Sequence, residues 1–265
     1  MFGHRQGAAA GPRAGGLMGP HVFRWGMLGA GLLMLLGGPA DAVVKAPEIR
    51  AHPGNLVPEC VSPRRLMLFM KERNPSLDPV YADIARLYKV HGEANRVRWD
   101  YAFFQMLIET NYLSYRRGSG WGDAKPKQFN FAGLGTTGRG VAGESFPDVS
   151  TGVLAQIQHL VAYSGDKVDN PVARRTRENQ DGIIALSRRL RRPVTWADLT
   201  NRWAMDRRYW AGIESIAERF RSAHCHGIDE QDEDEAFQHF IDTVRPPDIL
   251  ADPRPRLHRP PHRQR

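Results

Sequence analysis

The sequence lacks strand-rich segments, internal repeats and apolar runs long enough to cross a membrane comfortably. Its apolar run "GMLGAGLLMLLGG", from Gly26 to Gly38, falls short of the ~20 residues that a membrane-spanning helix needs. The length of 265 residues leaves room for one sizeable domain with appendages, or for two small domains. With 41% hydrophobic and 25% charged residues, the composition is that of an ordinary globular protein.

The N-terminal region contains no acidic residue before its apolar run. Residues 1–25 carry three arginines, and the small-residue sequence "ADA" follows the run and ends at Ala42. A positive region, a short apolar core and an A-x-A site are typical of a secretory signal peptide. We therefore predict a signal peptide at residues 1–42, with an uncleaved anchor as the alternative. In either case the remaining chain is exported to the periplasm or the extracellular space, and membrane contact is confined to this segment.

Cysteine is scarce, with only Cys60 and Cys225 in the chain. In an exported protein, two cysteines favour one disulfide, which here would join the two ends of the predicted domain. Closing so long a loop contributes on the order of 4 kcal/mol in the chain-entropy model. The alternative is a metal site at "HCHG", but adjacent ligands without a distant fourth group are a weak metal signal. We predict the disulfide and no bound metal or cofactor.

The formal net charge of +8 and the pI near 9.8 favour an anionic partner. However, part of the positive charge lies in the two ends of the chain, and no nucleic-acid-binding motif is present. The one basic cluster inside the predicted domain, Arg188–Arg192, is typical of a solvated helix end. The sequence therefore predicts no nucleic-acid partner.

Apolar residues at helical spacing predict a mostly α fold. Residues 43–58 show no periodicity and are interpreted as a linker, residues 59–227 as the domain, and residues 228–265 as an acidic and then basic Pro-rich tail without fixed structure. Capping residues such as Ser62, Asp78, Asp148, Thr195 and Asp206 mark helix starts. The predicted helices lie at residues 62–74, 77–95, 97–110, 150–165, 182–192, 195–204 and 206–224. Between residues 114 and 149 the helical pattern gives way to a glycine-rich loop or short hairpin, where function is expected.

The stretch "FFQMLIETNYLSY", from Phe103 to Tyr115, is almost entirely apolar up to its one carboxylate, Glu109. The helix that carries it is apolar nearly all round, which predicts a central buried helix. Burial and the negative end of the helix dipole both raise the pKa of a carboxyl group. A protonated carboxyl in a cleft wall is what glycosidic cleavage needs as a general acid. The alternative is a solvated residue that pairs with an arginine.

Four segments then follow in order: "IETNYLSY", "PKQFNFAGLG", "GESFPDVSTGVLAQIQHLVAY" and "WAMDRRYWAGIESI". Together, over about Arg98 to Arg221, they resemble the glucosaminidase domain family of peptidoglycan β-N-acetylglucosaminidases and mannosyl-glycoprotein endo-β-N-acetylglucosaminidase-like enzymes. The resemblance implies a lysozyme-like, mostly helical domain with Glu109 as its acid. It also implies that Tyr209 faces the scissile sugar, although core packing is the alternative for this residue. Residues expected at the substrate are Asn130, Phe131, Gly133 and Trp121, with burial in the core as the alternative for Trp121.

A second carboxylate is harder to find. Many members of the family carry one on a hairpin after the Asn-aromatic segment, but here that region is short, and Glu144 and Asp148 are the candidates. Asp148 directly precedes a helix and fits an N-cap, so Glu144 is the predicted water-activating base. Should neither act, the N-acetyl group of the substrate would assist and Glu109 would work as the only protein acid.

The sequence thus predicts an exported, monomeric glycoside hydrolase that acts on peptidoglycan glycan strands. Three alternatives stay open: a lytic transglycosylase, which needs one glutamate; an N-acetylmuramoyl-peptide amidase, which usually needs zinc; and a non-catalytic wall-binding module. His159 lies in a largely apolar helix and is interpreted as a structural histidine.

Overall fold

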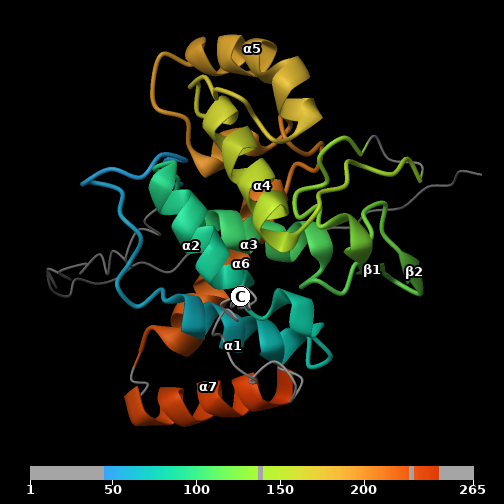
Figure 1. The fold of residues 1–265 in the computed structure, drawn as a ribbon. Helices are drawn as coiled ribbons and strands as arrows, with labels where there is room; N and C mark the ends of the chain where they lie inside the picture. Colours follow the sequence, from blue (N-terminus) through green and yellow to red (C-terminus); the bar gives the residue numbers. More distant parts are fainter. Residues whose placement is uncertain (1–44, 137–139, 227–229, 245–265) are drawn as a thin grey trace, which may run out of the picture. The chain divides into compact units, whose positions relative to one another are not determined.

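The computed structural model describes residues 45–136, 140–226 and 230–244, so the predicted signal peptide lies outside the described residues. Within these ranges the protein is mostly helical, as predicted (Figure 1). One small hairpin, β1 (Arg116–Arg117) and β2 (Gly120–Trp121), is the only sheet among these residues. The α-helices are α1 (Pro63–Arg73), α2 (Ile84–Ala94), α3 (Trp99–Thr110), α4 (Val149–Tyr163), α5 (Arg174–Arg188), α6 (Tyr209–His224) and α7 (Glu230–Val244). Short 3₁₀ helices are η1 (Pro79–Tyr81), η2 (Pro126–Gln128) and η3 (Trp196–Leu199).

Helix α3 is the central buried helix that its all-round apolar sequence predicts. Every residue from Trp99 to Leu107 is buried, and α2, α4 and α6 pack against the helix (Figure 1). The helix ends where Asn111 adopts the left-handed conformation. Because α3 is enclosed by three helices, the backbone of its last turn is held in a fixed position.

Two predicted helix starts are confirmed by their capping contacts. The Ser62 side chain accepts a hydrogen bond from the Arg65 amide at 3.1 Å, and Pro63 occupies the first helical position of α1. The Asp148 carboxylate accepts from the Thr151 amide at 2.7 Å and caps α4. Asp148 is therefore a cap, as its sequence position indicates.

Helix α5 is longer than the sequence pattern predicts. It begins at Arg174, eight residues before the expected start at Gly182. Its first half, "RRTRENQD", contains no apolar residue and buries only Thr176 and Gln180 against the domain. A helix that buries polar side chains produces no apolar periodicity, so the pattern could not reveal it.

The segment interpreted as a linker is instead part of the folded domain. Ile49 is fully buried, its amide donates to the Val194 carbonyl at 2.9 Å, and its carbonyl accepts from the Arg98 amide at 2.9 Å. Isolated bridges join Glu48 to Thr195 and Arg50 to Val97 on either side of it. The domain therefore starts before the predicted boundary at residue 59, because backbone pairing with distant segments leaves no local sequence pattern.

The predicted structureless tail is also partly wrong, because the acidic run lies in helix α7. The helix packs against α1, and Phe240 is 2% exposed. The guanidinium carbon of Arg64 lies 4.7 Å from the ring centroid of Phe237. The Pro- and Arg-rich residues 245–265 lie outside the described residues.

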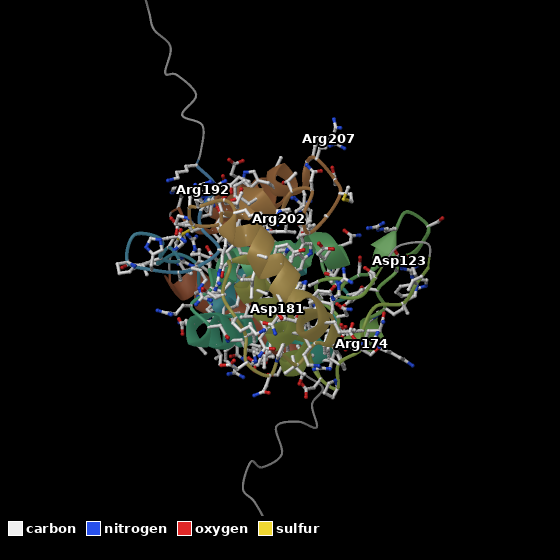
Figure 2. The ribbon with its side chains drawn as sticks, turned by 90° about the horizontal axis from the view of Figure 1, so that it is seen from above. Asp123, Arg174, Asp181, Arg192, Arg202 and Arg207 are labelled. Carbon is white, nitrogen blue, oxygen red and sulfur yellow. A yellow bond between two sulfur atoms is a disulfide. The ribbon has the colours of Figure 1, made fainter. Side chains whose placement is uncertain are left out.

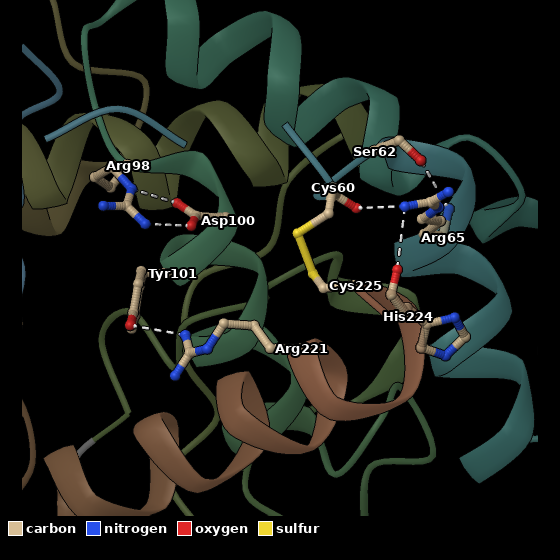
Figure 3. The surroundings of a disulfide bond; sticks show 9 residues. All are labelled: Cys60, Ser62, Arg65, Arg98, Asp100, Tyr101, Arg221, His224 and Cys225. Carbon is tan, nitrogen blue, oxygen red and sulfur yellow. Dashed lines mark hydrogen bonds and ion pairs between the residues drawn. A yellow bond between two sulfur atoms is a disulfide. The ribbon is translucent and has the colours of Figure 1, made fainter. Parts of the chain in front are cut away.

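The predicted disulfide joins Cys60 and Cys225 across 165 positions of sequence, with a Cα–Cα distance of 5.1 Å (Figure 3). It fastens the segment before α1 to the end of α6. Arg65 strengthens the same junction, because its Nη1 donates to the His224 carbonyl at 3.1 Å (Figure 3). Among the described residues, no helix is long and apolar enough to span a bilayer.

Candidate active site

Glu109 lies in the last turn of α3, half-buried, where two cavities meet. One cavity, of about 260 Å³, extends toward the β1–β2 hairpin, and the other, of about 240 Å³, extends toward α4, α5 and the segment after η3. Both are lined by Glu109, Gly133 and Thr136. The carboxyl group is therefore accessible from both sides while most of its surroundings are protein.

Burial raises the pKa of Glu109 from 4.5 to about 7. The Tyr209 hydroxyl, the positive charge of Arg117 and the Trp203 side chain all oppose this rise, because each favours the charged carboxylate. The balance leaves a large protonated fraction at neutral pH. Glu109 is thus able to give up a proton and then to exist as a stabilised anion. The raised pKa agrees with the prediction from the apolar stretch before Glu109.

Tyr209 is the first residue of α6, buried, with its hydroxyl donating to Glu109 Oε1 at 2.5 Å. The hydroxyl in turn accepts a hydrogen bond from Gln105 Nε2 at 2.8 Å, and Gln105 Oε1 accepts from Gln156 Nε2 at 2.8 Å. At the far end, the Tyr88 hydroxyl donates to Gln156 Oε1 at 2.5 Å. These four hydrogen bonds form a relay from α2 through α4, α3 and α6 to the carboxyl.

The relay fixes the direction of every donor in it. Both amide side chains are fully buried, so each amide orientation is set by the partners on its two sides. Because Gln105 occupies the acceptor side of the Tyr209 oxygen, the hydroxyl proton points to Glu109. These four buried hydrogen bonds together hold the acid in one orientation.

The chain leaves α3 through a run of residues in the left-handed conformation. Asn111, Tyr112, Leu113 and Tyr115 all have positive φ, between 48° and 60°. Such conformations cost bulky side chains of order 1–3 kcal/mol each and persist only where surrounding contacts enforce them. Here Leu113 is 5% exposed and its amide donates to Thr110 Oγ1 at 2.9 Å. The turn that follows the acid is held by packing.

Asn130 and Phe131 do not line the cleft, and the prediction that they do is wrong. Asn130 is fully buried: its Oδ1 accepts from the Leu134 amide at 2.9 Å, and its Nδ2 donates to the Leu134 and Glu144 carbonyls. Phe131 is fully buried and packs edge-on against Tyr81. Both side chains stabilise the loop that forms the cleft wall.

Gly133, by contrast, lies in the wall of both cavities. This position agrees with the prediction that Gly133 is a cleft residue. Its φ is +61°, and a Cβ at this position would lie 3.2 Å from Thr136 Oγ1 and 3.7 Å from Glu109 Oε2. Glycine is therefore suited to both the backbone conformation and the close approach to the acid.

Glu144 is not placed to act as a base in the cleft. Its two carboxylate oxygens accept the amides of Arg174 and Arg175 at 2.7 and 2.6 Å, at the start of α5, and it lines neither cavity. A carboxylate at a helix N-terminus is stabilised by the unpaired amides there. The carboxylate that shares a cavity with Glu109 is Asp123, which accepts a hydrogen bond from the Gly140 amide at 3.1 Å.

The hairpin comes before the Asn-aromatic segment in the chain. Trp121, at its end, is 53% exposed and lines neither cavity. The Arg116 guanidinium carbon lies 4.6 Å from the Trp121 ring centroid. Trp121 is therefore on the surface beside the hairpin-side cavity, whereas Arg116 and Arg117 line that cavity.

His159 is buried but reaches the second cavity. Burial lowers its pKa to about 3, so the ring is neutral at physiological pH. Its Nδ1 is 3.0 Å from Thr176 Oγ1, and its ring packs edge-on against Tyr163 and Trp203. These contacts fit the structural histidine expected from the sequence.

A comparison with known proteins finds a relative of this chain. The chain is 32% identical over 153 residues to an uncharacterized protein of Borreliella burgdorferi, and the match covers 57% of this chain and 69% of the relative. The two proteins belong to one family. No protein-family model and no solved structure matches the chain.

Several residues of the site were not predicted from the sequence. Gln105 could have been recognised, because it is an isolated amide inside the apolar stretch that precedes Glu109. Asp123 and Trp203 lie in irregular segments and Arg117 lies in the two-residue strand β1, so only the folded chain brings these residues to Glu109. Within the described residues, no group of three His, Cys, Asp or Glu side chains is arranged to hold a metal ion.

A larger cavity, of about 630 Å³, lies between α1 and α7 and does not include Glu109. Its surface is mainly apolar, with Leu68 and Phe240 among the lining residues. Size alone does not make it the better candidate for catalysis, since the acid with a pKa near neutrality lies elsewhere.

Proposed function

We propose that the protein is an exported glycoside hydrolase that cleaves peptidoglycan glycan strands at N-acetylglucosamine linkages. The observation that carries this proposal is Glu109, a half-buried carboxyl with a pKa of about 7 at the junction of two open cavities. Glycosidic cleavage requires an acid that is protonated at neutral pH and that reaches the leaving oxygen. The sequence resemblance to glucosaminidases supports the substrate class.

In this mechanism Glu109 donates its proton to the glycosidic oxygen as the bond from that oxygen to the anomeric carbon breaks. The negative charge then left on Glu109 is stabilised by the Tyr209 hydroxyl and by the charge of Arg117. Water supplies the hydroxyl group of the new reducing end, and its remaining proton restores the acid.

The group that assists the water is either Asp123 or the N-acetyl group of the substrate. Asp123 supports the first route because it lines the same cavity as Glu109. The stereochemistry of the product separates the two routes. A base on the protein acting on water gives inversion at the anomeric carbon, and assistance by the N-acetyl group gives retention.

A lytic transglycosylase is the second candidate, and the position of Glu144 favours keeping it. The Glu144 carboxylate is bound to the start of α5, so Glu109 is the one glutamate placed to act as the acid. A lytic transglycosylase needs one such glutamate. Mass spectrometry of the products distinguishes the two, because a transglycosylase leaves anhydro-muramic ends and a hydrolase leaves reducing ends.

The test is Glu109→Gln assayed on purified peptidoglycan for new reducing ends. Glutamine keeps the shape of the side chain and removes the transferable proton, so activity should fall by at least about a hundredfold. Glu178→Gln is the matched control, because Glu178 is an exposed glutamate that pairs with Arg174 on α5. Release of reducing ends by Glu109→Gln at the rate of the unmodified protein would disprove the proposal.

A further inference from the structure

We infer that the cavity on the α5 side of Glu109 is a subsite for a carboxylate group of the substrate, bound by Arg175 and Arg202. The inference rests on the proposed function for the identity of the polymer. It adds a chemical requirement that the proposed function does not contain, namely a negative charge on the glycan next to the cleaved bond.

The lining of this cavity is cationic. Arg175 and Arg202 both line it, and Glu109 is the only acidic residue among the described residues of the lining. When Glu109 is protonated, no negative side chain that the structure describes in this lining offsets the two guanidinium groups. A concave site with one sign of charge concentrates ligands of the other sign.

Neither arginine forms an ion pair with a described carboxylate, whereas Arg174 and Arg192 do. Arg174 pairs with Glu178 at 3.8 Å, and Arg192 pairs with Asp198 at 2.6 Å. The Arg175 amide is bound to Glu144, but its guanidinium group has no carboxylate partner among the described residues. The charges of Arg175 and Arg202 are therefore available to a ligand.

Arg202 is held in place by contacts that leave its charge uncompensated. Its Nη2 donates to Ser187 Oγ at 2.6 Å, and its guanidinium carbon lies 5.4 Å from the ring centroid of Tyr163. Its Nη1 is buried without a hydrogen-bond partner. Figure 2 shows Arg202 beside α5, on a different part of the molecule from Asp123 at the hairpin. Preorganised guanidinium groups bind carboxylates strongly because little freedom is lost on binding.

The remaining lining groups suit a sugar that carries such a charge. His159 is 5% exposed, and because its Nδ1 contacts Thr176, Nε2 is the ring nitrogen left for a ligand in the cavity. Trp203 and Tyr163 form an aromatic wall, with ring centroids 5.1 Å apart. Aromatic faces pack against pyranose rings, and a polar nitrogen beside them orients a hydroxyl or amide group.

Peptidoglycan offers carboxylates of two origins. Strands from which the stem peptides have been removed carry a free lactyl carboxylate on each muramic acid, and strands with stems carry the carboxylates of the peptide. A β-1,4-linked oligomer of N-acetylglucosamine has the same backbone linkage and no carboxylate. The neutral oligomer distinguishes recognition of the charge from recognition of the sugar. The two kinds of charged strand distinguish the lactyl carboxylate from the carboxylates of the peptide.

The experiment measures equilibrium binding of each ligand to the full chain carrying Glu109→Gln, which prevents turnover. We expect strands of at least one of the two carboxylate-bearing kinds to bind more tightly than the neutral oligomer. The tighter kind identifies the origin of the carboxylate. Arg175→Gln or Arg202→Gln should each weaken that binding by about fivefold and leave the neutral oligomer unaffected.

Arg174→Gln is the control, because it removes the same charge one residue away, from a side chain that is exposed and paired with Glu178. Arg202→Lys tests geometry at constant charge, and thermal denaturation checks that each variant is folded. The inference is overturned if Arg174→Gln weakens binding as much as Arg175→Gln does. It is also overturned if the neutral oligomer binds as well as both charged strands.

The two proposals fail separately. If the unmodified protein releases reducing ends but binding does not depend on Arg175 and Arg202, the subsite is wrong and the hydrolase stands. If no reducing ends appear but the charged strands bind through the two arginines, the subsite stands and the hydrolase is wrong.

Discussion

The hydroxyl of Tyr209 donates to Glu109 Oε1 at 2.5 Å, joining the first residue of α6 to the last turn of α3 across 100 positions of sequence. The contact opposes the effect of burial on the carboxyl, so the pKa of Glu109 stops at about 7. A group that titrates near neutral pH is both a proton donor and a stable anion under working conditions.

Tyr209→Phe should raise the pKa of Glu109 further and slow the reaction. The hydroxyl stabilises the charged carboxylate, so its removal favours the protonated form and moves the alkaline limb of the pH–rate profile upward. Losing a donor to the developing charge should lower kcat by about a hundredfold. The measurement is kcat/KM against pH. Tyr112→Phe, a tyrosine whose hydroxyl accepts from Arg219, is the control and should leave the profile in place.

Glu109 should make the domain less stable as the pH rises. Its pKa in the folded state, about 7, is above the ordinary value of 4.5, so the folded state binds more protons between these values. The stabilisation is complete below pH 4.5 and is lost as the pH rises through 7. Glu109→Gln should therefore exceed the unmodified protein in stability at pH 8, by up to about 3 kcal/mol, and match it near pH 4.

Urea denaturation at the two pH values checks this prediction. Glu178→Gln, on the exposed face of α5, should show no such dependence. Equal stability of Glu109→Gln and the unmodified protein at pH 8 would show that burial of the charged Glu109 carboxylate does not destabilise the folded state.

The relay behind Tyr209 should affect the acid without touching the substrate. Gln105→Met removes the amide that holds the Tyr209 hydroxyl and leaves Gln156 with an unpaired donor, which costs about 1–3 kcal/mol of stability. Because the hydroxyl is then free to turn away from Glu109, the alkaline limb of the pH–rate profile should also move upward.

Tyr88→Phe breaks the same relay at its far end and serves as the comparison. It should lower stability to a similar extent, with a smaller change in the pH profile, because Gln105 still orients Tyr209. If both variants lose stability and neither profile moves, Gln105 is purely structural.

Two carboxylate substitutions should separate Asp123 from Glu144. Asp123→Asn should lower activity by about a hundredfold or more if Asp123 activates the water. Glu144→Gln should weaken the connection to the start of α5 and leave most of the activity, since its carboxylate binds the Arg174 and Arg175 amides. The assay combines initial rates on peptidoglycan with the anomeric form of the product. Retention of configuration, with an active Asp123→Asn, would assign the role to the N-acetyl group.

Removing the disulfide should lower stability without altering the acid. The double variant Cys60→Ala, Cys225→Ala should lose about 2–4 kcal/mol, because the unfolded chain regains the freedom that the bridge removes. Thermal denaturation with and without reductant measures the effect. The reductant should lower the midpoint of the unmodified protein and leave that of the double variant unchanged.

Features that depend on neighbouring residues were predictable from the sequence. The apolar stretch before Glu109 predicted a buried helix and an acid with a raised pKa, and Ser62 and Asp148 predicted helix starts. The disulfide followed from cysteine number and expected compartment. The helix starts and the raised pKa depend on residues that are adjacent in the sequence. The disulfide could form in only one way, because the chain has two cysteines.

Features that depend on contacts between distant segments were not predictable. Glu144 looked available for catalysis because the amides that bind it belong to α5, whose polar start carried no helical signal. Asn130 looked like a cleft residue because only the folded loop shows its amide bound to Leu134. Ile49 lay in an apparent linker because its partners, Val194 and Arg98, are far along the chain.

The four left-handed residues Asn111, Tyr112, Leu113 and Tyr115 determine which side of the cleft can adapt to a substrate. A backbone already forced into an unfavourable conformation by packing has few neighbouring conformations to move to, so the wall directly after Glu109 should behave as a rigid edge. The hairpin that follows has two residues in each strand, all exposed. We therefore expect hydrogen exchange to be slow in the turn and fast in the hairpin, so that a ligand in the hairpin-side cavity is accommodated by movement of the hairpin and not of the turn.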